Sequence, residues 1–310
     1  MRKSVFIFTL LIFTIFVIPS GATIWQTYND STLKLAISEA QKNDVIYLHP
    51  GTYNLSVDLN KNALSLIGKN AEEVIFNLSG SNLKMSAENC VLSGVTVVNS
   101  SRGVEVKSSG CEIRECIFDG LTYSTGVYIK EDNTIFRDNV VSNCTGAYFA
   151  VYGLGDDCTY TGNNFINNSC AGLSLYVNSD SNVVCNNVFR QNKYGIYIWS
   201  AGSGNKIYLN DFIENDEDII ASSPPTIQWN SPESLSYTYN GVSLSGHLGN
   251  YWDEHSASDG DENGILDTPY TVPYGTGTDS YPLKLGFQRY IGTENTLADL
   301  VPDSLYPLTL

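Results

Sequence analysis

Short apolar stretches separated by polar residues and glycine recur along the middle of the chain, between residues 90 and 222. Four of them share the form Gly-apolar-x-apolar, and they begin at Gly103, Gly126, Gly172 and Gly195. Their starts lie 23, 46 and 23 residues apart, so the omitted member of the series falls at Phe149 and the next one at Asp218. Alternation inside a fixed 23-residue period predicts short β-strands, each stacked on the same strand of the next repeat.

A second set of strands accompanies the first at nearly the same period. Its members begin at Cys116, Asn139, Asn164, Asn187 and Asn210. We predict that these asparagines form a ladder at one corner of each coil, because their amides can hydrogen-bond along the stack. The glycines are expected at the next corner, in a left-handed conformation. The predicted fold class is all-β, a right-handed parallel β-helix formed by one chain with coils of about 23 residues.

The two ends of this solenoid differ from its coils. Residues 32–40 have helical periodicity, and four apolar residues share one face: Leu33, Ala36, Ile37 and Ala40. Three residues are suited to cap the start of this helix: Asp30, Ser31 and Thr32. We expect an N-terminal helical cap over residues 23–43, the β-helix over 44–222, a C-terminal cap over 223–285 and a tail over 286–310.

Residues 1–22 have the pattern of a secretory signal peptide. A basic start, Met1-Arg2-Lys3, precedes an apolar run from Val5 to Ile18, and small residues follow up to Ala22. The run is short for a membrane span, so we expect cleavage near Ala22 and no transmembrane segment in the mature chain. The protein would then be extracellular, on the cell surface or periplasmic. Export would make six Asn-x-Ser/Thr sequences available for glycosylation: Asn29, Asn54, Asn77, Asn99, Asn143 and Asn167.

Composition excludes several classes of protein. The 310 residues carry a net charge of −16, and charged residues make up only 16% of the chain, which is too few for a coiled coil. Loss of Arg2 and Lys3 with the signal would leave 15 basic against 33 acidic residues, a mature charge of −18. This balance argues against a nucleic-acid partner, and a hydrophobic content of 42% argues against disorder.

Several segments resemble those of one known family. The sequence NDVIYLHPGTY (residues 43–53) is followed by LSLIG (64–68) and Asn-rich coils, and the C-terminal part contains GNYWD (249–253), SDGDENGILDTPY (258–270) and DSYPL (279–283). The chain is similar in these features, over about residues 32–285, to the NosD-like secreted β-helix proteins of archaeal and bacterial surfaces. That family shares its fold with pectate lyases and other carbohydrate-active proteins.

The resemblance also implies copper binding, because NosD proteins are described as periplasmic copper-binding proteins linked to the maturation of nitrous oxide reductase. The residues do not support that role here. Copper sites favour soft thioether and imidazole ligands, and Met85 is the only methionine left after signal removal. Three histidines remain, His49, His247 and His255, of which only the last two are candidates for a metal pair. We therefore expect no copper.

An Asp-rich loop near the C-terminus has the side chains of a calcium site. Its predicted ligands are Asp259, Asp261, Asn263, the carbonyl of Ile265, and Asp267. Gly264 stands at position 6 of this loop, as in an EF-hand, but Tyr270 stands at position 12, where an EF-hand has its bidentate Glu. The loop therefore predicts a structural Ca²⁺ site of another type, and the alternative is an acidic turn held by its own hydrogen bonds.

Paired carboxylates are weak candidates for catalysis. Asp156 and Asp157 are adjacent, as in β-helix hydrolases that cleave a glycosidic bond between an acid and a base. The repeat places Asp156 in a turn column, which favours a structural role. A polysaccharide lyase would need a basic residue near a uronate. The four arginines of the coils are not expected to share one outward column: Arg102, Arg114, Arg137 and Arg190.

Aromatic residues recur at outward positions of one predicted sheet. If Phe149 and Val151 point inward, Tyr152 points outward. The expected outer face carries Tyr128, Tyr152, Tyr176, Tyr197 and Trp199, with Lys107 and Lys130 beside them. Exposed rings on a rigid sheet suit stacking on sugar rings, and the lysines would suit anionic groups. The alternative is ordinary packing of the rings on one another or beneath the C-terminal cap.

Seven cysteines lie within the coils, and none forms a Cys-x-x-Cys pair. Cys90 with Cys111, and Cys144 with Cys170, stand at matching positions of neighbouring coils and could form disulfides. Buried free thiols are the alternative.

The sequence predicts a non-catalytic, exported protein of the cell surface that binds an extracellular or envelope polysaccharide or builds an envelope layer with other surface proteins. A polysaccharide lyase or glycoside hydrolase is the alternative, and a NosD-type role in metalloenzyme maturation is the least favoured.

Overall fold

A computed structural model describes residues 21–122, 125–145, 148–223 and 226–290. The predicted signal peptide lies outside the described residues except for its last two positions, and so does the tail beyond residue 290. Among the described residues, no helix is long and apolar enough to cross a bilayer.

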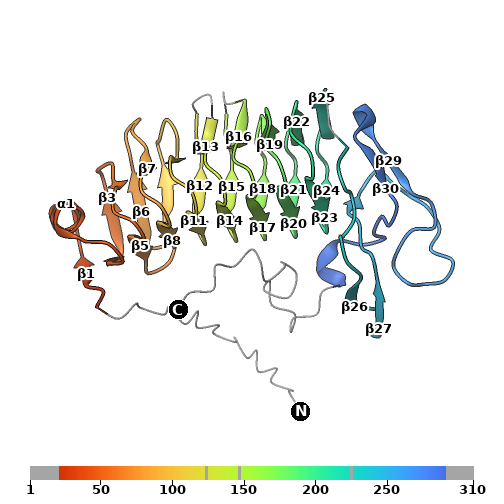
Figure 1. Ribbon diagram of the computed structural model, residues 1–310, viewed down its shortest axis with the longest axis horizontal. Helices are drawn as coiled ribbons and strands as arrows, with labels where there is room; N and C mark the ends of the chain where they lie inside the picture. Colours follow the sequence, from red (N-terminus) through yellow and green to blue (C-terminus); the bar gives the residue numbers. More distant parts are fainter. Residues whose placement is uncertain (1–20, 123–124, 146–147, 224–225, 291–310) are drawn as a thin grey trace, which may run out of the picture.

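The described chain winds into a parallel β-solenoid with three sheets, so the predicted all-β fold with a period near 23 residues is confirmed (Figure 1). Sheet A consists of β1 (Ile24–Thr27), β2 (Val45–Leu48), β5 (Ser65–Gly68), β8 (Val91–Ser93), β11 (Glu112–Arg114), β14 (Ile135–Arg137), β17 (Thr159–Thr161), β20 (Val183–Cys185) and β23 (Lys206–Tyr208). Sheet B consists of β3 (Gly51–Tyr53), β6 (Val74–Asn77), β9 (Thr96–Val98), β12 (Ile117–Asp119), β15 (Val140–Ser142), β18 (Asn164–Ile166), β21 (Val188–Arg190), β24 (Asp211–Ile213) and β28 (Tyr251–Trp252). Sheet C consists of β4 (Asp58–Leu59), β7 (Leu83–Met85), β10 (Val104–Val106), β13 (Thr125–Ile129), β16 (Phe149–Gly153), β19 (Ala171–Tyr176), β22 (Tyr194–Trp199) and β25 (Glu217–Ser222).

Inward side chains form continuous columns through the core, because parallel strands in register place equivalent residues above one another. In sheet B, aromatic rings stack from Phe165 to Phe189, Phe212 and Trp252, with centroids 4.7, 5.2 and 4.5 Å apart. All four side chains are buried. Burial of each such ring stabilises the fold by roughly 2 kcal/mol.

The predicted asparagine ladder is present at the corner between sheets A and B, with one change of register. Its members are Asn139, Asn163, Asn187, Asn210 and Asn250, and each accepts hydrogen bonds from the backbone N–H of the member before it or, for Asn139, of Cys116. Asn163 occupies the place that the spacing assigned to Asn164, which instead pairs with Val140 and Val188 in sheet B. The assignment of Asn164 was wrong by one residue, because the ladder asparagine stands two residues before the inward apolar side chain, as Asn163 does before Phe165 and Asn187 before Phe189.

The repeated glycines are not corner residues in a left-handed conformation, so that prediction was wrong. They lie at the start of the sheet C strands, where there is no room for a side chain. A Cβ atom on Gly126 would lie 2.3 Å from the carbonyl oxygen of Ala150, and one on Gly195 would lie 2.5 Å from that of Asp218. The left-handed corners are instead occupied mostly by polar residues such as Asn99, Asn143 and Asn167.

A short helix, α1 (Asp30–Glu39), lies at the N-terminal end of the solenoid (Figure 1). It packs on β1 and β2 and buries Leu33 and Ala36, with Ala40 buried directly after it. The residue at the N-cap position is Asn29, and the three residues predicted for that position lie inside the helix. Asn29 forms a capping box with Thr32, in which each side chain accepts a hydrogen bond from the other residue's backbone N–H.

The C-terminal region folds back over the solenoid. It contains two hairpins, β26 (Leu235–Tyr239) with β27 (Val242–Gly246) and β29 (Tyr270–Val272) with β30 (Gly277–Asp279), and two short 3₁₀ helices, η1 (Pro273–Gly275) and η2 (Phe287–Arg289). Tyr237 and Tyr239 of the first hairpin join a second apolar cluster with Val183 and Cys185 of β20. Tyr290 is fully buried in this cluster, so the described part of the tail packs into the fold.

All seven cysteines are buried free thiols. Cys90 and Cys111 lie at matching positions of neighbouring coils, since the backbone N–H of Glu112 donates to the Cys90 carbonyl. Neither this pair nor Cys144 with Cys170 forms a disulfide. Burial raises the pKa of the Cys116 and Cys158 thiols to about 12, so these thiols stay protonated and unreactive.

Candidate functional site

The outer surface of sheet C carries a cluster of aromatic side chains, which we call the aromatic face. It consists of Tyr128, Phe149, Tyr152, Tyr176, Tyr194, Tyr197 and Trp199. The strand register explains how they meet: one row runs from Glu105 through Tyr128, Tyr152 and Ser174 to Tyr197. The structure therefore brings together the five aromatic residues that the sequence pattern selected.

Phe149 also belongs to this face, whereas the sequence pattern placed it inside. Its ring stacks on Tyr152, with centroids 5.1 Å apart and planes 14° apart. The register pairs Thr125 with Phe149 and Val127 with Val151, so Ala150 takes the position of the repeated glycine. Ala150 is fully buried. The small size of Ala150 was the sequence signal that could have located this coil correctly.

The rings of the aromatic face pack on one another. Tyr128 and Tyr152 are stacked at 5.1 Å, Tyr176 and Trp199 at 6.0 Å, and Tyr197 and Trp199 at 6.0 Å. Nearly parallel planes at these centroid distances overlap only in part, as in offset stacking. Trp199 remains 39% exposed, and burial raises the pKa of Tyr152 to about 12. The face is thus a packed cluster of half-buried rings with one exposed member, Trp199, and not a row of separate open rings.

Cations border the N-terminal end of the aromatic face. The guanidinium of Arg102 lies 5.1 Å from the ring centroid of Tyr128, and the ammonium of Lys130 lies 5.7 Å from it. Glu105 forms ion pairs with Lys107 at 3.6 Å and with Arg102 at 3.7 Å, so both cations are partly neutralised. The two predicted lysines therefore differ, and only Lys130 contacts a ring of the face.

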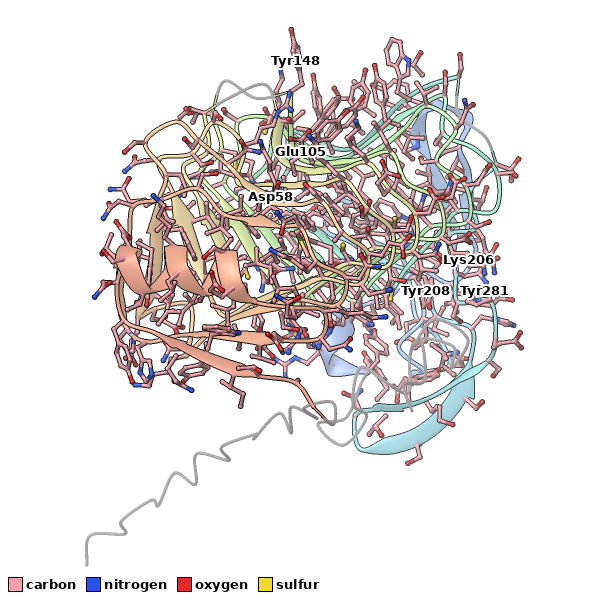
Figure 2. All side chains as sticks on the ribbon, turned by 60° about the vertical axis from the view of Figure 1, so that its left-hand side comes forward. Asp58, Glu105, Tyr148, Lys206, Tyr208 and Tyr281 are labelled. Carbon is pink, nitrogen blue, oxygen red and sulfur yellow. The ribbon has the colours of Figure 1, made fainter. Side chains whose placement is uncertain are left out.

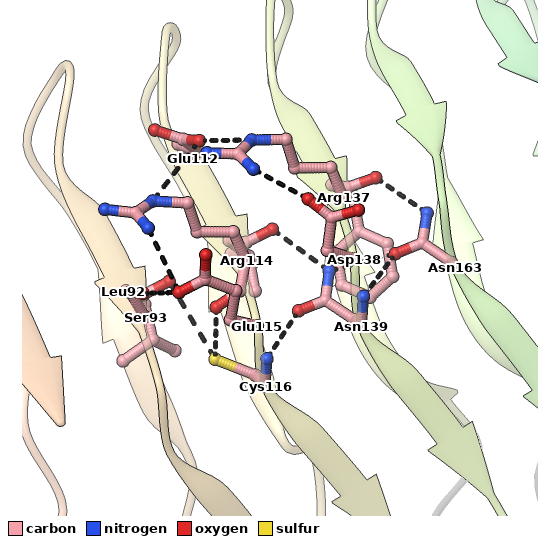
Figure 3. A network of polar contacts seen from close by, with 12 residues as sticks. Leu92, Ser93, Glu112, Arg114, Glu115, Cys116, Arg137, Asp138, Asn139 and Asn163 are labelled. Atoms are coloured by element: carbon pink, nitrogen blue, oxygen red, sulfur yellow. Dashed lines mark hydrogen bonds and ion pairs between the residues drawn. The ribbon is translucent and has the colours of Figure 1, made fainter. Parts of the chain in front are cut away.

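A second candidate site is a groove of about 870 Å³ on the outer side of sheet A, where β8, β11 and β14 turn toward sheet B. We call it the charged groove. One wall carries Glu112, Arg114, Glu115, Arg137 and Asp138 (Figure 3). The four arginines of the coils do not form one column, but two of them meet here, because β11 and β14 pair Arg114 directly with Arg137, whereas Arg190 lies on β21 of sheet B.

Ion pairs hold the side chains of the charged groove. Glu112 accepts from Arg137 Nε at 2.7 Å and lies 3.5 Å from Arg114 Nε, while Arg137 Nη1 donates to Asp138 at 2.7 Å. Arg114 Nη1 pairs with Glu115 at 3.2 Å. Burial raises the pKa of Asp138 in spite of the opposing effect of Arg137. Carboxylates and guanidinium groups thus alternate along a concave surface.

Asp156 lies in a turn, as the repeat predicted. Its Oδ1 accepts the backbone N–H of Asp180 at 2.8 Å, and its own N–H donates to Asp132 Oδ1 at 2.9 Å. The three aspartates thus form a turn column in consecutive coils. Asp157 adopts a left-handed conformation beside it, with φ of 53°. This arrangement ties Asp156 to the backbone of its neighbours.

The Asp-rich loop curls around its own backbone N–H groups. Asp259 accepts from the N–H of Asn263 at 3.0 Å and of Gly264 at 3.2 Å, and the Lys284 ammonium lies 3.3 Å from it. Asp267 accepts from the N–H of Gly260. Within the described ranges, no three Asp, Glu, His or Cys side chains come together as a metal-binding group. The calcium site therefore stays a prediction.

The three histidines lie in different surroundings. His49 Nε2 contacts Gln26 at 2.7 Å, His247 Nδ1 contacts the Ser231 carbonyl at 2.8 Å, and His255 Nε2 contacts the Thr268 carbonyl at 2.9 Å. Met85 is buried in the core. Within the described residues, these side chains do not come together as the donor set that copper requires.

Fold and surface together define a class: a parallel β-solenoid whose outer sheets carry an aromatic cluster and a charged groove. The family described as "Periplasmic copper-binding protein (NosD)" matches residues 21–257, and the chain belongs to this family. The resemblance noted from sequence motifs is thus confirmed. No curated protein matches the chain.

Among solved structures, the chain is similar to the PL6 family polysaccharide lyase Pedsa3628 from Pseudopedobacter saltans, with 15% identity and a TM-score of 0.49 over 83% of this chain and 72% of the other. It is similar to the PL6 family alginate lyase AlyGC, with 14% identity and a TM-score of 0.46 over 62% of this chain and 35% of the lyase. The pectin methylesterase PemA from Erwinia chrysanthemi shares 11% identity at a TM-score of 0.33, over 76% of this chain and 91% of the esterase. The chain spans only about a third of the length of AlyGC, and none of these similarities transfers an activity to it.

Proposed function

We propose that this NosD-family protein is exported and binds a polysaccharide, without cleaving it, through the aromatic face of sheet C. The observation that carries the proposal is the gathering of seven aromatic side chains on one outer sheet, with Trp199 39% exposed and Tyr148 beside them 75% exposed. Figure 2 shows Tyr148 projecting away from the ribbon at this surface. Apolar side chains of this size are costly to leave in water unless a ligand covers them.

Saccharides fit this surface better than other ligands. A pyranose ring has apolar C–H faces and a rim of hydroxyl groups, which complement aromatic faces and tyrosine hydroxyls. The parallel strands give the rings a rigid backbone support, so little backbone entropy is lost on binding. Lys130 at one end adds a place for an anionic substituent.

The experiment is a glycan array followed by titration calorimetry of the mature protein and two variants. Trp199→Ala should weaken binding at least about tenfold, since aromatic anchors commonly contribute more than about 1.4 kcal/mol. Tyr28→Ala is the matched control, because Tyr28 is 59% exposed and stacks on His49 directly after strands β1 and β2 of sheet A, not on sheet C. Equal binding by Trp199→Ala and the wild type would refute the proposal.

A polysaccharide lyase or hydrolase is the second candidate, and one observation favours it. Arg114 and Arg137 stand side by side in the charged groove, next to Glu112 and Asp138. Cations beside carboxylates are the groups needed to neutralise a uronate and to move a proton. Release of new reducing ends or unsaturated sugars by the wild type, with loss in Arg137→Ala, would establish catalysis and overturn the non-catalytic proposal.

We also propose that the protein works outside the cytoplasm, alone or with other surface-layer proteins. The signal-like pattern of residues 1–22 supports export, and the family is described as periplasmic. Fractionation of cells that express the full chain, with mass spectrometry of the N-terminus, would test this: a mature protein beginning near Thr23 is expected outside the cytoplasm.

A further inference from the structure

One hydroxyl group beneath the aromatic face has no hydrogen-bond partner among the described residues. Ser174 lies on β19 in the outward row between Tyr152 and Tyr197, yet its side chain is fully buried. Its Oγ atom neither donates nor accepts a hydrogen bond within the described part of the chain. Such a buried hydroxyl is costly, because folding removes its water without replacing it.

Rings from two strands that are not neighbours meet above β19. β16 and β22 flank β19 in sheet C, and the rings of Phe149 and Tyr197 approach to 5.2 Å between centroids. In the same two rows β19 contributes only Ala171 and Ser174, and both are fully buried. The rings therefore close over a gap that two small side chains leave in the sheet surface.

We propose that this gap is a saccharide subsite that opens on binding. Phe149 and Tyr197 separate, a sugar ring enters between them over β19, and one of its hydroxyl groups hydrogen-bonds to Ser174 Oγ. The inference rests on the proposed function of the aromatic face. The unsatisfied Ser174 hydroxyl is the observable sign that an open, ligand-bound state exists. The free-energy cost of burying it without a partner in the closed state disappears when a ligand pairs with it.

Thr125 supports the same interpretation. It pairs with Phe149 on the other side, from β13, and its Oγ1 atom is also buried without a partner among the described residues. Two orphaned hydroxyl groups thus flank the coil that contributes Phe149 and Tyr152. Other such atoms occur elsewhere among the described residues, as at Ser179 and Asn186, but these two hydroxyl groups lie beside one ring cluster, which supports a ligand of matching polarity there.

The test compares Ser174→Ala with the wild type by calorimetry, using cellohexaose, chitohexaose and an oligogalacturonate as probes, and by thermal melting without ligand. Ser174→Ala should bind the active probe about 3- to 10-fold more weakly, which is the loss of one hydrogen bond. Its melting temperature should be unchanged or higher, because an unsatisfied group has been removed. The matched control is Ser108→Ala, whose hydroxyl donates to the Ser86 carbonyl at 2.9 Å. It should melt lower and bind normally.

Three results would overturn the inference. In the first, a probe loses its affinity for Trp199→Ala but binds Ser174→Ala as tightly as the wild type. The subsite is then absent and the proposed function stands. If Ser174→Ala melts lower, as Ser108→Ala should, the hydroxyl has a partner in the free protein. If no probe binds to the wild type, the proposed function fails and the subsite with it.

Discussion

Asn187 provides the sharpest test of how the solenoid is held together. Its side chain is fully buried and makes four hydrogen bonds. Oδ1 accepts from the backbone N–H and the Nδ2 of Asn163 at 2.9 and 3.0 Å, while Nδ2 donates to the Tyr160 carbonyl and to Asn210 Oδ1, both at 2.9 Å. Asn187→Ala removes all four and leaves the Asn163 N–H and the Tyr160 carbonyl buried without these partners.

At about 1 kcal/mol for each hydrogen bond, Asn187→Ala should lower the free energy of unfolding by about 4 kcal/mol. For a fold of this length that corresponds to a fall in melting temperature of roughly 7 °C. Denaturant unfolding followed by circular dichroism measures the change. The comparison holds if the slope of the unfolding free energy against denaturant concentration is the same in the variant and the wild type.

Asn164→Ala is the matched control for this prediction. Asn164 lies directly after a ladder residue in the sequence, but its side chain makes no hydrogen bond within the described residues and faces outward on β18. The change should cost less than about 0.5 kcal/mol. The reasoning would be refuted if the two variants were equally destabilised, or if Asn187→Ala lost less than about 1 kcal/mol.

Two further predictions concern the C-terminal region. Burial raises the pKa of Asp211 and Asp279 to about 6 and that of Asp218 to about 7, all above the ordinary value of 3.8. Between about pH 4 and pH 7 the folded state therefore binds more protons than the unfolded state. The stability that these groups contribute is present in full below about pH 4 and is lost as the pH rises through 6 to 7. The melting temperature should therefore be higher at pH 5 than at pH 8. An equal or lower melting temperature at pH 5 would contradict this. For the Asp-rich loop, Ca²⁺ should raise the melting temperature and a chelator should reverse the rise, an effect that Asp259→Asn should abolish. The absence of both a shift and a heat of binding would exclude the calcium site.

The sequence by itself determined the architecture, because a solenoid repeats one local pattern. Each coil is short, its apolar residues alternate with a period of two, and the 23-residue spacing fixes which residues stack. For the same reason the outward aromatic residues could be selected: Tyr128, Tyr176, Tyr197 and Trp199 keep the phase of the repeat, and all four meet on sheet C. The family resemblance followed from short motifs near the two ends.

Only the tertiary structure decided the features that depend on exact register or on contacts between coils. The exact register placed Asn163 and not the adjacent Asn164 in the ladder. One additional residue in the coil between Val127 and Val151 turned Phe149 outward, because a shift of one residue reverses the side of a strand on which a side chain lies. The pairing of Arg114 with Arg137, which creates the charged groove, required the alignment of strands β11 and β14. The burial of Ser174 depended on rings from β16 and β22 meeting above it, a contact between strands two coils apart that no local pattern contains.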